Sequence, residues 1–172
     1  MLILESFLLT VGQIIREYII FAILFAFLML YIRYKAGKRN NIGCFFFYLY
    51  LVIIYGATIL SRVGTEKVIT EDFLGIKQLF QNPWYIVSFI ENIFMFVLFG
   101  ILFVIAFYGV RVQCLKGALF VSLSVELLQG IFHLGEAQII DLCSNVLGAF
   151  LGWIVMNKIY LWKWRKNHSS GK

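Results

Sequence analysis

Apolar runs long enough to cross a membrane recur along the whole chain, and they leave little room for any other fold. A spanning helix needs roughly 20 mostly apolar residues, because the hydrocarbon core is about 30 Å thick. Of the 172 residues 62% are apolar and 14% are charged, which is not the composition of a soluble domain. The five predicted spans are 18–34, with an earlier start allowed by the apolar stretch 8–15, then 42–60, 84–110, 115–132 and 139–160.

The stretch between the second and third spans, 63–84, is too polar to cross the bilayer. Ile69, Phe73, Ile76 and Phe80 nevertheless recur there at helical spacing. This pattern predicts an amphipathic helix lying on a membrane surface. The predicted fold class is therefore all-α: a single-domain (1–172) polytopic membrane helical bundle of about five transmembrane helices plus an amphipathic outer-surface helix.

The basic residues predict the orientation, because cytoplasmic loops carry an excess of lysine and arginine. If the spans alternate, eleven of the fifteen basic residues fall on one side, in 33–39, 111–116 and 158–172. All nine acidic residues fall in the opposite half. We therefore predict a multi-pass protein of the cell membrane with the N-terminus outside and the C-terminus cytoplasmic. The expected partner is membrane lipid and not nucleic acid. Whether the chain forms a homo-oligomer is left open by the sequence.

Polar side chains from four spans are predicted to reach about the same depth, just below the outer surface. Ser122, Glu126, Gln129 and His133 form one stripe, in steps of four, three and four residues. The 139–160 span contributes Asp141 and Asn145, and the 84–110 span contributes Ser88, Glu91 and Asn92. Ser61 and Arg62 lie at the end of the 42–60 span. A carboxylate near the bilayer centre costs about 2.5–3.5 kcal/mol on insertion scales, so these groups should face each other, Arg62 or water.

From this convergence we predict a polar pocket that opens outward under the amphipathic helix. The predicted ligand-binding residues are Glu126, Gln129, Asp141, Asn145, Asn92, Glu91 and Arg62. The alternative is that they only hold the helices together, as single polar residues in membrane bundles often do. Ser88 and Ser122 are expected to bond back to their own helices.

No cofactor, metal or catalytic residue is predicted. Glu126 and His133 lie seven residues apart, about 10 Å along a helix, so one zinc ion cannot bind both. Cys44, Cys114 and Cys143 lie in separate apolar runs and are expected to be small core residues.

The segment "LSVELLQGIFHLGEAQIIDLCSNVLGAFLG" resembles the signature of the VanZ-like membrane proteins. In that family E-x-x-Q on one helix is followed by D-x-x-x-N-x-x-G on the next, and the matching residues are Glu126, Gln129, Asp141, Asn145 and Gly148. The upstream "ENIFMFVLFG" is similar to another family stretch, with Asn92, Phe96 and Gly100 in register. The resemblance covers roughly 48–153.

Two positions depart from the family pattern. Leu98 stands where the family usually has a proline, so a kink is not expected there. The turn before Asp141 lacks the usual arginine, for which Arg62 is a candidate substitute. Gly148 and Gly152 form a small-xxx-small pair, which we expect to let the 115–132 span approach closely.

The resemblance implies low-level resistance to teicoplanin, a lipid-tailed glycopeptide, without alteration of the peptidoglycan stem peptide. The expected function is a protein of a Gram-positive cell envelope whose pocket binds a lipoglycopeptide or a lipid-linked cell-wall precursor. Two alternatives are an intramembrane enzyme acting on a lipid head group, with Glu126 and Asp141 as acid and base, and a small transporter. The enzyme lacks a recognisable nucleophile, and the transporter lacks polar residues in the cytoplasmic half.

Overall fold

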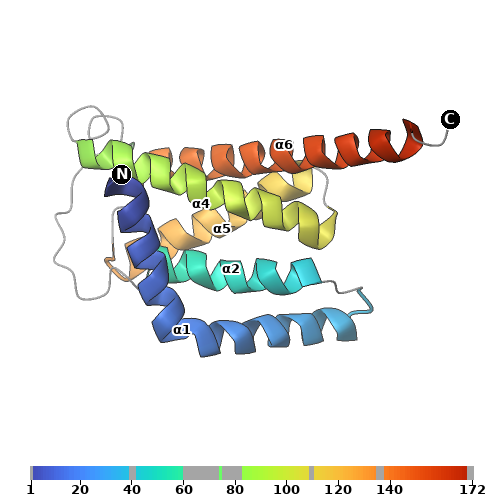
Figure 1. The fold of residues 1–172 in the computed structure, drawn as a ribbon. Helices are drawn as coiled ribbons and strands as arrows, with labels where there is room; N and C mark the ends of the chain where they lie inside the picture. Colours follow the sequence, from blue (N-terminus) through green and yellow to red (C-terminus); the bar gives the residue numbers. More distant parts are fainter. Residues whose placement is uncertain are drawn as a thin grey trace.

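The protein is a bundle of long antiparallel helices, in a computed structural model that describes residues 2–38, 42–59, 74, 83–108, 111–134 and 138–169 (Figure 1). The described ranges contain helices and turns and no strand. The helices are α1 (Leu2–Lys35), α2 (Ile42–Thr58), α4 (Pro83–Phe107), α5 (Arg111–Ile131) and α6 (Ile139–Ser169). The all-α fold class is thus confirmed.

Three of the helices are long and apolar enough to cross a membrane: α4, α5 and the Ile139–Trp162 part of α6. Large apolar side chains cover the outside of the bundle, including Phe94, Phe120 and Ile131, each more than 60% exposed. A soluble protein rarely exposes so much contiguous apolar surface. The exterior therefore suits lipid rather than water.

The helix ends agree with the predicted spans within about four residues, except at the start of α1 and the end of α6. α2 and α6 begin at the predicted residues, Ile42 and Ile139. α1 begins far earlier than residue 18, at Leu2, and α6 continues past residue 160 to Ser169. At about 1.5 Å per residue both helices are longer than the hydrocarbon core is thick, so each extends beyond it or tilts. The predicted amphipathic helix lies outside the described residues.

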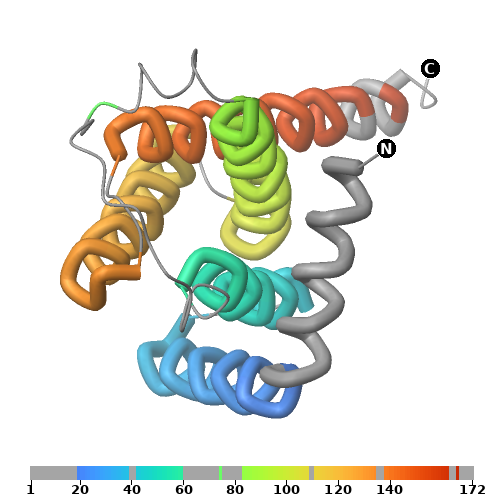
Figure 2. The backbone as a smooth tube through the Cα atoms, turned by 90° about the vertical axis from the view of Figure 1, so that its left-hand side faces the viewer, coloured from blue at the N-terminus to red at the C-terminus, as the bar shows by residue number. Residues whose placement is uncertain are grey.

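α4 lies at the centre of the bundle, between α6 on one side and α2 on the other (Figure 2). α1 packs mainly on α2, and α5 packs mainly on α6. No kink was expected at Leu98, because this residue takes the place of a proline. α4 is indeed a continuous helix through Leu98.

The core between α2 and α4 is aromatic. The Phe47 ring of α2 lies 5.3 Å from the Phe99 ring, 5.7 Å from Phe103 and 5.0 Å from Phe107, all edge to face. Such pairs add about 0.5–1.5 kcal/mol beyond area burial. The Tyr50 hydroxyl donates to the Met95 carbonyl at 2.7 Å, so the same interface also satisfies a buried polar group.

One turn places a helix end that matters for the site. After α5, His133 adopts a left-handed conformation with φ of 52°. Its amide donates to the Gly130 carbonyl, and the Leu134 amide donates to the Gln129 carbonyl. These two bonds form a Schellman motif, which ends α5 and turns the chain back toward α6.

Candidate functional site

The Glu126 side chain lies at the start of α6. Its Oε2 accepts a hydrogen bond of 3.0 Å from the backbone amide of Gln138. The Gln138 carbonyl in turn accepts from the amides of Asp141 and Leu142, so Gln138 is the N-cap residue of α6. A carboxylate at this position satisfies a free amide and is stabilised by the helix dipole. Glu126 is only 8% exposed, so these interactions offset much of the cost of its burial.

Gln129 connects α5 to the end of α2. Its Nε2 donates to the Thr58 carbonyl at 2.8 Å. Thr58 is the last residue of α2, where carbonyl oxygens lack partners within the helix. The Gln129 amide therefore caps α2 while it is itself 2% exposed.

Asn92 and Asp141 join α4 to α6. The Asn92 Nδ2 donates to Asp141 Oδ1 at 2.9 Å, which is a charge-assisted hydrogen bond if the carboxylate is ionised. Both residues are half-buried, as is Glu91 beside them. Asp141 also lies in the first turn of α6, where a negative charge is favoured.

Asn145 lies one turn further along α6 and faces α5. Its Nδ2 donates to the Ser122 Oγ at 2.8 Å, between two side chains that are 3% and 0% exposed. Ser122 was expected to bond to its own helix, but it accepts from the neighbouring one instead. Asn145 Oδ1 has no hydrogen-bond partner within the described part of the chain. A buried acceptor without a partner is costly, so this atom is suited to accept a bond from a ligand or water.

The close approach of α4 and α6 brings Asn92 and Asp141 together. A Cβ atom on Gly148 would overlap the Ile93 carbonyl oxygen, and one on Gly152 would overlap the Val97 carbonyl oxygen. Gly100 faces the Ala149 carbonyl in the same way from the α4 side. The expectation that this glycine pair faces the 115–132 span, α5, is therefore wrong. The glycines face α4 because α6 packs most extensively on that helix.

Glu126 also lies at the edge of an apolar groove between α5 and α6 with a volume of about 390 Å³. Leu123, Leu127 and Ile139 line this groove beside Glu126 and Gln138. Leu127 and Ile139 are exposed, so the groove opens on the lipid-facing surface rather than toward the helix bundle centre. A polar group of a ligand at the Glu126 end of the groove would contact the Glu126 carboxylate.

Most of the chain matches a known protein family. The family model described as VanZ/LLP1 matches residues 18–162, which is most of the chain. The chain belongs to the VanZ/LLP1 family. A search of the curated proteins found no match, and a search of the solved structures found none either.

The VanZ/LLP1 match confirms the resemblance seen in the sequence and, with the three long apolar helices, makes this a membrane protein. The match includes every residue that carried the resemblance. Within the described ranges the predicted residues lie in α4, α5 and α6. Asn92 bonds to Asp141, Glu126 and Gln129 bond to helix ends, and Asn145 bonds to Ser122. Arg62 lies outside the described residues.

Sequence reasoning missed several partners of the predicted residues. Tyr55 of α2 donates to Ser124 Oγ at 2.5 Å, because the Ser124 hydroxyl is itself donating to the Val121 carbonyl. This bond adds a second polar link between α2 and α5, one turn below Gln129. The Tyr55 and Thr58 spacing on one helix face was a signal for it, whereas the backbone amide of Gln138 carries no signal in sequence.

No metal ligand set is found among the residues that the structure describes: no three His, Cys, Asp or Glu side chains converge there. The polar groups at this end of the bundle are two carboxylates and several amides, which form separate pairs at the helix interfaces. This combination can accept hydrogen bonds from hydroxyl and amine groups and can donate through the amide nitrogens. It is suited to recognition of a polar ligand.

Proposed function

We propose that this VanZ/LLP1 protein binds the polar head of a lipid-linked or lipoglycopeptide ligand at the outer leaflet of the cell membrane and thereby gives low-level teicoplanin resistance. The single observation that supports this most is Asn145 Oδ1, a buried acceptor that has no partner among the described residues and lies one helical turn after Asp141. A purely structural set of interhelical bonds would be expected to satisfy such an atom.

The depth of the polar groups supports an outer-leaflet site. Glu126 lies five residues before the end of α5, about 8 Å below it, and Asn145 lies six residues into α6, about 9 Å below its start. Both helix ends meet at the same turn, 132–138. A ligand head at this depth would be in the headgroup region while its lipid tail stays in the acyl chains.

The orientation belongs to the same proposal. With five passes, the basic connections at 33–39 and 111–116 and the tail fall on the cytoplasmic side, and the 132–138 turn falls outside. The polar residues then face the leaflet in which teicoplanin and lipid-linked precursors expose their head groups. The predicted roof helix and Arg62 would complete the site from above.

The chemistry of the site favours a ligand rich in hydroxyl and amine groups. Glu126 and Asp141 accept hydrogen bonds when ionised, and the amides of Asn92, Gln129 and Asn145 can both donate and accept. Sugar hydroxyls and peptide amines of a lipoglycopeptide provide such donors. The carboxylates disfavour an unaccompanied phosphate, so a phosphate-bearing ligand would depend on Arg62.

The test compares drug sensitivity in a susceptible Gram-positive host. We expect the wild-type chain to lower sensitivity to teicoplanin but not to vancomycin, which has no lipid tail, and the Asp141→Ala variant to lose this effect. Phe94→Ala is the matched control, because Phe94 is 63% exposed on the outside of α4, two residues from Asn92. Membrane levels of each variant are measured in parallel. Equal teicoplanin sensitivity in all strains at equal protein levels would contradict the proposal.

A further inference from the structure

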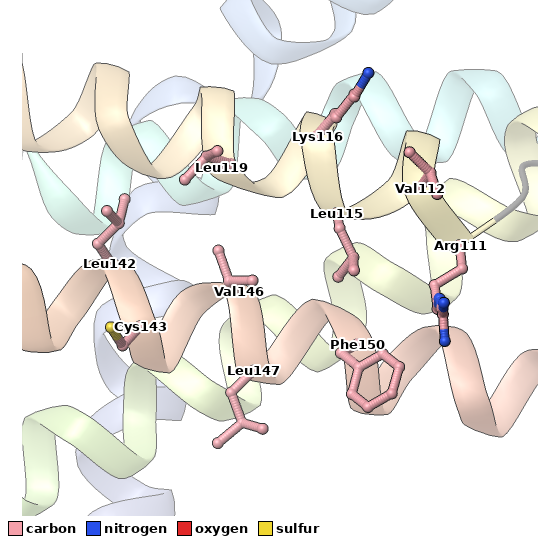
Figure 3. Close-up of a pocket in the computed structure, with 10 residues that line it drawn as sticks. All are labelled: Arg111, Val112, Leu115, Lys116, Leu119, Leu142, Cys143, Val146, Leu147 and Phe150. Atoms are coloured by element: carbon pink, nitrogen blue, oxygen red, sulfur yellow. The ribbon is translucent and has the colours of Figure 1, made fainter.

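A second groove lies between α5 and α6, on the other side of Leu142 from Glu126. Its volume is about 790 Å³, within the range of small-molecule sites (roughly 300–1,000 Å³). We call it the Arg111 groove; its lining includes Arg111, Leu115, Lys116, Leu119, Val146 and Phe150. Figure 3 shows Leu115 and Val146 pointing into the space between the two helices. The walls are therefore apolar along most of their length.

Both charged residues of the Arg111 groove are cations. Among the ten lining residues, Arg111 and Lys116 are the only charged ones, and none is a carboxylate. Arg111 reaches from the first residue of α5 across toward α6, beside Phe150, whereas Lys116 points away from α6 (Figure 3). The groove thus has a positive end at the start of α5 and an apolar body.

The dimensions of the groove match one leaflet. From Arg111 to Leu119 the chain advances eight residues, about 12 Å along the helix, and half of the hydrocarbon core is about 15 Å. Arg111 therefore lies at the depth of lipid phosphates when the apolar residues lie at the depth of acyl chains.

We infer that the Arg111 groove binds one anionic phospholipid, with an acyl chain between α5 and α6 and the phosphate at Arg111. Guanidinium groups bind phosphate oxygens in bidentate geometry, and the net negative charge of the head group is attracted to Lys116 as well. This site is separate from the polar site near Glu126, and only its assignment to the inner leaflet rests on the orientation given under the proposed function. With the basic residues on the cytoplasmic side, the lipid comes from the inner leaflet.

A second copy of the chain fits the Arg111 groove less well. A two-fold contact places the same surface of both copies together, so Arg111 and Lys116 would face the same cations of the partner. Like charges brought together in a medium of low dielectric repel strongly. An anionic lipid supplies the opposite charge and needs no matching surface.

Native mass spectrometry of the purified protein tests this inference. The full chain in detergent is mixed with phosphatidylglycerol or phosphatidylcholine of identical acyl chains, and the dissociation constant of the first lipid is measured for each. We expect phosphatidylglycerol to bind about tenfold more tightly, because both lipids offer a phosphate to Arg111 but the choline of phosphatidylcholine brings a positive charge toward Arg111 and Lys116. Arg111→Gln should weaken the binding of both lipids and reduce this preference, and Lys116→Gln should reduce the preference as well.

Two further variants keep the result interpretable. Lys158→Gln removes an exposed cation of α6 that does not line the groove, so the preference should stay. Val146→Phe fills the groove and keeps Arg111, so it should weaken the binding of both lipids by a similar factor. Equal affinity of the wild type for both lipids, or loss of the preference in Lys158→Gln as large as in Arg111→Gln, would overturn the inference. A dimer that Val146→Phe dissociates would overturn it in favour of a second copy.

Discussion

The Gly148→Ala variant tests whether the contact between α4 and α6 holds the polar residues in place. A methyl group on Gly148 would overlap the Ile93 carbonyl oxygen and would lie 3.0 Å from Phe96 Cβ, where ordinary contacts begin at 3.4 Å. Both neighbours are in α4, and the overlapped atom belongs to backbone. The overlap can be relieved only if the two helices move apart, by about 1 Å.

Such a shift would break a specific hydrogen bond. Ile93 is the residue after Asn92, and the Asn92 to Asp141 bond is 2.9 Å long. A separation of about 1 Å takes the two atoms past the range of a hydrogen bond. Overpacking costs about 1–3 kcal/mol, and the lost interhelical bond adds about 0.6 kcal/mol, the average measured in a membrane protein. The gain in helix propensity from alanine, about 0.5–1 kcal/mol, offsets part of this cost, so we expect Gly148→Ala to lower the free energy of unfolding by about 1–3 kcal/mol in total.

Gly130→Ala is the matched control. Gly130 is also a helical glycine near the polar residues, but a Cβ there meets nothing within 4 Å. Replacing glycine by alanine in a helix stabilises by about 0.5–1 kcal/mol, so this variant should be slightly more stable than the wild type. The free energy of unfolding of both variants is measured in detergent, with far-UV circular dichroism as the probe. If Gly148→Ala is as stable as Gly130→Ala, the close contact between α4 and α6 is refuted.

Three further predictions follow from the same contacts. In a double-mutant cycle, Asn92→Ala and Asp141→Ala should show a coupling energy of about 0.6–1.7 kcal/mol, and additive effects would refute their bond. Glu126→Gln keeps an oxygen that can accept from the Gln138 amide, but it loses the negative charge at the α6 N-terminus, so it should lower the free energy of unfolding by about 0.3–1 kcal/mol. Glu126→Leu also leaves that amide unpaired and should lower the free energy of unfolding by at least about 1 kcal/mol more. His133→Gly should raise the thermal unfolding midpoint, because glycine adopts the left-handed conformation of the Schellman turn without strain, and a lowered midpoint would contradict this.

The helices could be predicted well where hydropathy alone defines them. α2 and α6 begin at the predicted residues because polar or charged residues directly precede a continuous apolar run. α1 could not be delimited in this way, since Arg16 and Glu17 interrupt the apolar pattern, but backbone hydrogen bonding continues through charged residues.

The identity of the polar residues was predictable, but their pairing was not. Spacing along a helix places Glu126 and Gln129 on one face and Asp141 and Asn145 on another. It does not say which helix that face meets, because helix rotation and order are set by packing. The glycine pair shows this: Gly148 and Gly152 were correctly expected to face a close neighbour, yet the neighbour is α4.

Backbone partners were the least predictable part. Glu126 bonds to the amide of Gln138, and Gln129 bonds to the carbonyl of Thr58. Every residue offers the same backbone groups, so only the positions of the helix ends decide which of them are free. The sequence could therefore indicate the polar side chains but not the two helix ends that they cap.

We propose that the polar residues of α4, α5 and α6 face a water-accessible site open to the outside. The most direct test of this proposal is the reaction of Asn92→Cys with a cationic, membrane-impermeant thiol reagent added to intact cells, with Cys143 replaced by alanine. The other two cysteines are buried, and a thiol reacts as the thiolate, which needs water. We predict that Asn92→Cys is labelled from outside, whereas Phe94→Cys, at the same depth but on the exposed outer face of α4, is not. Labelling of Asn92→Cys only from the cytoplasmic side, or no faster than Phe94→Cys, would contradict the account.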